Sequence, residues 1–128
     1  MPTHKPAGRN AVSPYLIVAD ARAMLAFLQA TFGALELCRN ARGDGSIMHA
    51  EVRIDDSVVM LGERPDGRDP VCCSTHVYVP DVDACYAAGL AAGASSVSPP
   101  TAQPYGDRSA GLRDPQGHLW WIGTHLSG

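Results

Sequence analysis

Apolar and polar positions alternate along the chain in a way that divides it into two halves with the same order of elements. In the first half, an apolar segment is followed by Asp20, which offers an N-cap, and by apolar residues at helical spacing that stop at Gly33. The next three segments are typical of strands, and Asp55-Asp56 joins the last two in a tight hairpin. The strands of this half are expected at residues 12–19, 34–39, 47–54 and 57–63.

The second half repeats this pattern after a turn-rich segment. Asp81 or Asp83 caps a second helix, which stops at Gly93. Asp83 corresponds to Asp20 of the first half, 63 residues earlier. The strands of this half are expected at residues 75–79, 94–98, 108–113 and 118–125, with a proline-rich loop over 99–107.

This repeat predicts an α+β fold made of two β-α-β-β-β modules with mixed β-sheets. A single helix covers only one face of its sheet, so the other face is expected to curve around something or to meet another sheet. We expect a flexible polar tail over 1–11 and a single domain over 12–128. Within that domain, the expected parts are a first module (12–63), a linker (64–73) and a second module (74–125).

Composition and charge narrow the classes of partner. The net charge of −3 and the lack of basic clusters argue against nucleic acid. No apolar run approaches the ~20 residues that a membrane span needs. The N-terminus lacks the apolar core of a signal peptide, so the expected location is the cytoplasm. The four cysteines have no metal-site spacing, and we expect reduced thiols.

The order of elements, together with three short motifs, resembles the vicinal oxygen chelate superfamily, which includes glyoxalase I, bleomycin-resistance proteins and extradiol dioxygenases. The branch that it resembles most is the PhnB-like, glyoxalase-like one. The motifs lie at Met48–Glu51, His76–Val79 and Gly117–Trp121. The resemblance covers residues 12–125 and implies modules paired into cupped eight-stranded sheets, a homodimer, and small-molecule sites inside the cups.

The metal-dependent members hold an ion with one side chain on each of four strands. The corresponding positions here are Ser13, Met60, His76 and Trp121. Only His76 is a ligand that divalent ions of this kind favour. We therefore expect the usual metal site to be absent and the protein to work without a cofactor, although a divalent metal held by other residues remains an alternative.

Strand alternation assigns the side chains to the two faces of each sheet. A hairpin that turns at Asp55-Asp56 places Glu51 opposite Met60, so both project into the cup with His49. In the last strand, Trp120 faces the core and Trp121 faces the cup.

The cup is therefore expected to combine aromatic and apolar walls with a few polar groups, as small-molecule sites do. Tyr105 lies in the proline-rich loop and is a candidate lid. The expected ligand-binding residues are Tyr15, His49, Met60, Tyr78, Tyr105 and Trp121, and the candidate catalytic residues are Glu51 and His76. Each has a structural alternative: a solvated sheet face, a hydrogen-bonded histidine, a dimer core or simple loop packing.

Three functions follow from this pattern. The first is metal-independent binding of a small, partly aromatic compound, in the drug-sequestering style of antibiotic resistance. The second is a lyase, isomerase or dioxygenase that uses His76 with Glu51 or His49, with or without a divalent metal. Without a metal, Glu51 or His76 would act as a general base. With a metal, His49, Glu51 and His76 would form a two-histidine, one-carboxylate set for Fe²⁺ or Zn²⁺. The third is an assembly module with a vestigial cup.

Overall fold

Both modules are present in the computed structural model, which describes residues 4–64 and 71–126, and each has the expected order of one strand, one helix and three strands. The first module contains β1 (Tyr15–Val18), α1 (Ala21–Phe32), β2 (Leu35–Ala41), β3 (Ile47–Ile54) and β4 (Ser57–Glu63). The second contains β5 (Ser74–Tyr78), α2 (Val82–Ala91), β6 (Ser95–Ala102), β7 (Asp107–Arg113) and β8 (Leu119–His125). The expected linker over 64–73 falls largely on residues outside the described ones.

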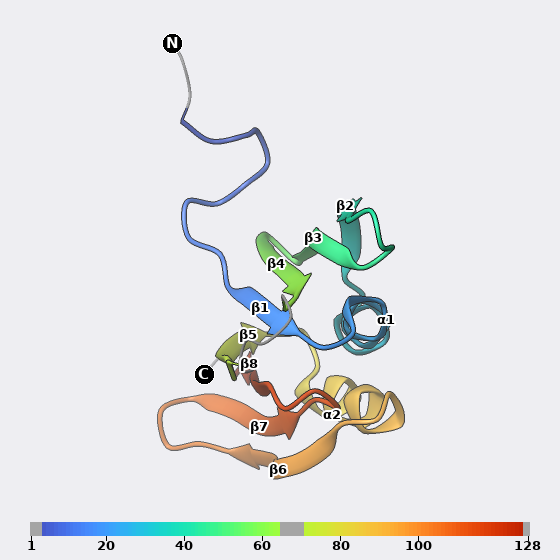
Figure 1. The fold of residues 1–128 in the computed structure, drawn as a ribbon. Coiled ribbons are helices and arrows are strands. Elements are labelled where there is room, and N and C mark those ends of the chain that lie inside the picture. Colours follow the sequence, from blue (N-terminus) through green and yellow to red (C-terminus); the bar gives the residue numbers. More distant parts are fainter. Residues whose placement is uncertain (1–3, 65–70, 127–128) are drawn as a thin grey trace.

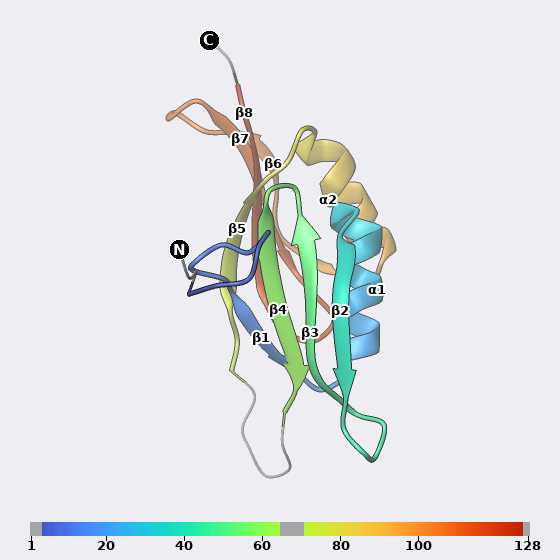
Figure 2. The same ribbon diagram turned by 90° about the horizontal axis from the view of Figure 1, so that it is seen from above.

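Each module forms its own four-stranded mixed sheet. The strand order is β1-β4-β3-β2 in the first sheet and β5-β8-β7-β6 in the second. The first strand of each module pairs in parallel with the last, and the remaining pairs are antiparallel. Both helices lie in the angle between the two sheets (Figures 1 and 2). This arrangement confirms the predicted fold class and leaves one face of each sheet without a helix.

The register of the β3–β4 hairpin is the predicted one. The chain turns at Asp55-Asp56, where Asp55 takes a left-handed conformation with φ 52°, and Glu51 pairs with Met60. The alternate residues of these strands belong to the core beneath the helices. The largest fully buried side chains are Trp120, Leu16, Met24, Leu28, Ile47, Leu61, Leu112 and Ile122.

An aspartate caps the N-terminus of each helix. Asp20 accepts from the backbone N–H of Ala23 (3.0 Å) and Asp81 from that of Ala84 (3.1 Å), so Asp81 is the second cap. Asp83 instead pairs with Arg108 through two hydrogen bonds. The first helix ends at Gly33 with φ 65°, as its sequence predicts.

The expected loop over 99–107 is wrong in part. Strand β6 continues through Pro99 and Pro100 to Ala102, and only residues 103–106 form the turn. The pairing of β6 with β7 passes from Ser98 directly to Thr101, so the two prolines lie where the ladder is irregular. A proline without an N–H is tolerated at such a position.

The turn before β8 is built around the carboxylate of Asp114, which is only 3% exposed. It accepts from the backbone N–H groups of Gln116 (2.8 Å) and His118 (3.2 Å) and from the indole N–H of Trp120 (2.8 Å). Three donors therefore converge on one buried group, which fixes both the turn and the tryptophan at the centre of the core.

The same turn joins the two modules. The Gln116 side chain accepts from the backbone N–H groups of Ala19 and Asp20 (2.9 Å each). The buried imidazole of His118 accepts at Nδ1 from the Cys73 N–H (2.9 Å), so its Nε2 donates to the Ile17 carbonyl (3.2 Å). The aspartate-proline turn is thus a hydrogen-bonded bridge from β8 to β1.

The segment before β1 makes contacts that its sequence does not indicate. Residues 4–14 contain no helix or strand. The amide oxygen of Asn10 nevertheless accepts from the Val58 N–H (3.0 Å), and the Gly8 carbonyl accepts from Arg53 (3.1 Å). These contacts lay the segment against the uncovered face of the first sheet.

We predict that replacing Asp114 with alanine lowers the free energy of unfolding by about 3 kcal/mol, because the indole N–H of Trp120 would stay buried without a partner. Urea unfolding followed by circular dichroism measures this change. Asp56→Asn, at an exposed turn residue, is the control and should change stability by less than about 0.5 kcal/mol. Equal effects of the two substitutions would contradict the role assigned to Asp114.

Candidate functional site

The predicted site residues fall on the two helix-free faces. Within one chain they form two groups, because each sheet has its own outer face. The first sheet carries Tyr15, His49, Glu51 and Met60. The second sheet carries His76, Tyr78 and Trp121, and Tyr105 follows in the turn between β6 and β7. The structure brings the members of each group together, but it does not bring His76 next to Glu51 or His49.

A chain of polar contacts runs across the first face. The Tyr15 hydroxyl lies 3.3 Å from His49 Nδ1, and His49 Nε2 lies 2.7 Å from one oxygen of Glu51. The other oxygen accepts from Nε of Arg9 (2.5 Å) in the segment before β1. The hydrogen bonds from His49 and then Arg9 lower the pKa of Glu51, so its carboxylate is ionised at neutral pH.

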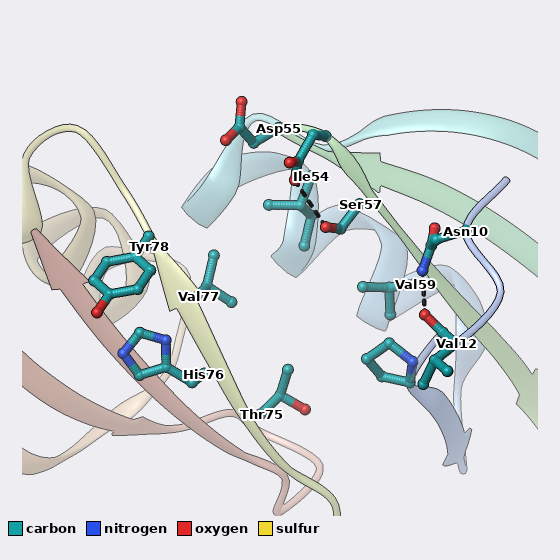
Figure 3. A pocket seen from close by; sticks show the side chains of 12 residues that line it. Asn10, Val12, Ile54, Asp55, Ser57, Val59, Thr75, His76, Val77 and Tyr78 are labelled. Carbon is teal, nitrogen blue, oxygen red and sulfur yellow. Dashed lines mark hydrogen bonds between the residues drawn. The ribbon is translucent and has the colours of Figure 1, made fainter. Parts of the chain in front are cut away.

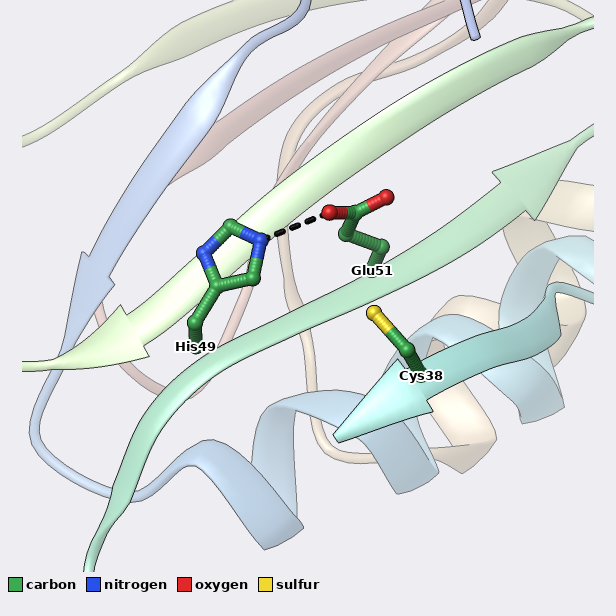
Figure 4. A group of neighbouring side chains, drawn as sticks. All are labelled: Cys38, His49 and Glu51. Carbon is green, nitrogen blue, oxygen red and sulfur yellow. Dashed lines mark hydrogen bonds and ion pairs between the residues drawn. The ribbon is translucent and has the colours of Figure 1, made fainter. Parts of the chain in front are cut away.

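Cys38 lies beside this chain of contacts because β2 places it opposite Glu51 (Figure 4). One ligand-type atom from each of Cys38, His49 and Glu51 lies within 4.8 Å of the others. A thiolate, an imidazole and a carboxylate are donors that Zn²⁺ accepts. In this chain, however, Arg9 already places a cation on Glu51, and burial, followed by the charge of Glu51, raises the pKa of Cys38 and keeps its thiol protonated.

The four positions that hold an ion in metal-dependent relatives do not fit a metal either. Ser13 accepts a hydrogen bond from the Asn10 amide, and Met60 offers only a thioether. Trp121 has no lone pair to give, and its indole N–H donates to Ser74 (2.8 Å). His76 is the one ligand-type side chain of the four, and a single ligand does not hold a divalent ion tightly.

A cavity of about 360 Å³ lies on the face of the second sheet and collects three of the predicted residues. Its lining residues are His76, Ser98, Gln103, Tyr105, Ser109, Ala110 and Trp121. The six-membered ring of Trp121 packs against Gly111, where a Cβ would come within 2.6 Å of the ring. Trp121 is 37% exposed and Tyr105 is 68% exposed, so both offer aromatic surface to a ligand.

Beside this cavity lies a buried carboxylate, Asp107, which the sequence analysis missed together with its partner His125. Asp107 is 5% exposed and accepts from the Tyr78 hydroxyl (2.8 Å) and from Nδ1 of His125 (2.9 Å). The His76 ring stands edge-on to Tyr78 with centroids 4.6 Å apart. The bond to Asp107 raises the pKa of Tyr78, and the bonds from His125 and Tyr78 lower that of Asp107. The expected hairpin of 108–113 with 118–125, extended by one residue, would have paired Asp107 with His125 on one face, as the structure does.

A second cavity, of about 420 Å³, opens between β4 and β5 (Figure 3). Val59 and Val77 form apolar walls, and Asn10 and Val12 close it from the side of the N-terminal segment. His76 and Tyr78 line this cavity too, and His76 thus borders both spaces.

The sequence model of the Glyoxalase/Bleomycin resistance protein/Dioxygenase superfamily matches residues 10–122. The uncharacterized protein Rv0887c of Mycobacterium tuberculosis is 36% identical, over 88% of this chain and 73% of its own. The uncharacterized protein Mb0911c of Mycobacterium bovis is also 36% identical, over 82% of its length.

Solved structures agree on the fold. TioX from Micromonospora sp. ML1 superposes with a TM-score of 0.77 at 30% identity, covering 91% of this chain and 99% of its own. The PhnB protein of Bacillus cereus gives a TM-score of 0.74 at 15% identity, covering 90% and 99%, and thereby supports the fold alone. The family match spans most of the chain and both modules, and the chain therefore belongs to the glyoxalase/bleomycin resistance protein/dioxygenase superfamily.

Proposed function

We propose that the protein binds a small, partly aromatic compound without a metal, in the style of the bleomycin-resistance branch of its superfamily. The observation that carries this proposal is the flat, partly exposed indole of Trp121 in a cavity that His76 and Tyr105 also line. A flat aromatic surface at the floor of a cavity favours a planar ligand, which stacks on it. Polar side chains at the rim, such as Gln103 and Ser109, would orient the ligand.

Metal independence is supported by the chemistry of the four usual positions. One solved relative, a variant of FosX from Listeria monocytogenes, is described as complexed with Mn(II) and a phosphonic acid, at 22% identity and a TM-score of 0.68. In this chain, Ser13, Met60 and Trp121 replace three of the side chains that would hold such an ion. Their replacement by a hydroxyl, a thioether and an indole favours binding over metal catalysis.

We further propose a homodimer. Each helix-free face carries exposed aromatic residues, Tyr15 on the first sheet and Tyr78 and Trp121 on the second. Because the helices occupy the angle between the sheets, these faces point away from each other in one chain (Figure 1). A two-fold assembly would set the first face of one chain against the second face of the other and complete a cup from both.

An enzyme that uses His76 with Glu51 or His49 is the second candidate, and within one chain these residues stand on different sheets. It would therefore need the assembled dimer.

No helix in the described parts of the chain is long and apolar enough to cross a membrane. We place the protein in the cytoplasm and propose sequestration of a toxic compound, as in antibiotic resistance, as its role.

Replacing Trp121 with alanine is expected to weaken the binding of a planar aromatic compound at least tenfold, which corresponds to ~1.4 kcal/mol of lost contact. Isothermal titration calorimetry with a screened aromatic antibiotic or metabolite measures the dissociation constant. Leu90→Ala on α2, away from both faces, is the matched control and should leave the affinity unchanged.

Removal of metal provides the complementary measurement. Titration of the wild-type protein after dialysis against EDTA should give the same dissociation constant as before. An affinity that falls with EDTA and returns with Mn²⁺, Ni²⁺, Fe²⁺ or Zn²⁺ would contradict the metal-independent mechanism. Unchanged binding by the Trp121 variant would instead move the ligand away from the second face.

The dimer predicts that sedimentation at micromolar protein concentration gives a molar mass twice that of the chain. Tyr15→Glu would place a charge on the first face, and Trp121→Glu would place one on the second. Either substitution is expected to shift the equilibrium towards monomer because a charge would be buried in the assembly. Sedimentation velocity measures this shift, and a wild-type protein that stays monomeric would rule out the shared cup.

The hydrogen bond between Asp107 and Tyr78 leads to a prediction about the pKa of Tyr78. The carboxylate accepts a hydrogen bond from the Tyr78 hydroxyl and places a negative charge beside it, and both effects favour the protonated phenol and raise its pKa. Asp107→Asn should therefore lower the pKa of Tyr78 towards that of an exposed tyrosine. Spectrophotometric titration of tyrosinate measures this shift, with Tyr78→Phe assigning the signal, and an unchanged titration would contradict the contact.

A further inference from the structure

We infer that the ligand of the proposed cup carries a planar cation, an amidinium or guanidinium group, which takes the place of Arg9 on Glu51. This inference rests on the proposed function and adds the chemical class of the ligand to it. It is drawn from the first face, where a side chain of the protein itself already occupies a carboxylate that the fold has half buried.

Glu51 is prepared for a cation by its strand neighbours. Its side chain is only 13% exposed, and β3 aims it at the helix-free face opposite Met60. His49 donates to one of its oxygens and is itself held by the Tyr15 hydroxyl, so the carboxylate cannot turn freely. A half-buried anion in a fixed orientation binds a positively charged group more strongly than an exposed one.

Arg9 is attached in a way that permits its exchange. It belongs to a segment without helix or strand, and it reaches Glu51 through a single N–H of its guanidinium. The neighbouring Asn10 is anchored separately to β4 through the Val58 N–H. Displacement of Arg9 would thus break no strand pairing, and an amidinium that donates two parallel hydrogen bonds would gain over the single bond it replaces.

The surroundings of Glu51 suit a flat organic cation. The centroids of the Tyr15 and His49 rings lie 5.7 Å apart with the rings tilted by 36°, and Met60 is the cross-strand partner of Glu51 on the same face. Aromatic faces attract cations and pack against planar groups. A metal ion is the rival occupant, since Cys38 is nearby, but the protonated thiol and the guanidinium already present favour the organic cation.

The experiment compares two probes of the same shape, 4-aminobenzamidine, which is a cation, and 4-aminobenzamide, which is neutral. Isothermal titration calorimetry on the full-length protein measures both. We expect the cation to bind at least tenfold more tightly than the amide. Glu51→Gln should remove that difference, whereas Glu36→Gln, at an exposed glutamate paired with Arg39, should leave it unchanged. Arg9→Ala should tighten binding of the cation at least threefold and leave that of the amide unaltered.

The outcomes separate this inference from the proposed function. Equal binding of the two probes would overturn the preference for a cation and leave aromatic binding intact, whereas binding of neither would overturn both. Weaker binding of the cation by the Arg9 variant would show that Arg9 contacts the ligand rather than yielding to it. A stoichiometric Zn²⁺ site that excludes the cation, and that Cys38→Ser removes, would replace the inference with a metal site.

Discussion

The structure depends on one buried carboxylate. Asp114 collects the N–H groups of its own turn and the indole of Trp120, and it thereby fixes the start of β8 in the middle of the second sheet. The turn that it organises then reaches β1 through Gln116 and His118. Three hydrogen bonds stabilise this buried carboxylate. The polar cluster therefore holds the core tryptophan in place and connects the two modules.

The attachment of β8 to β1 determines which faces of the two sheets are exposed. With β8 joined to β1 and both helices in the angle between the sheets, each module keeps one face for the core and presents the other outward (Figure 2). Because side chains alternate along a strand, consecutive residues lie on opposite faces of the sheet. Trp120 is fully buried, whereas Trp121 lies on the outer face. Two adjacent residues of one kind serve stability and recognition because a strand turns them in opposite directions.

Much of this arrangement was predictable from local rules. The hairpin turn at Asp55-Asp56 predicted the pairing of Glu51 with Met60. Alternation along the strands then assigned the other side chains to one face or the other. The contacts of Arg9 and Asn10 were not predictable, because a segment without periodicity gives no signal of the surface it will meet. Asp107 was missed for a related reason. The prolines indicated a loop over residues 99–107, so Asp107 was assigned to that loop although it is the first residue of β7.

The replacement of the ligand-type side chains forms a consistent set of changes. An indole at position 121 can lie on the sheet only because Gly111, its cross-strand partner, has no side chain, and it is oriented by Ser74 on the other side. Trp121 thus gives the second face an aromatic surface, while the first face carries the negative charge of Glu51, which pairs with Arg9. In the site proposed for a planar cation, the aromatic surface of Trp121 on one sheet and the Glu51 carboxylate on the other are complementary halves, which only the proposed dimer would bring together.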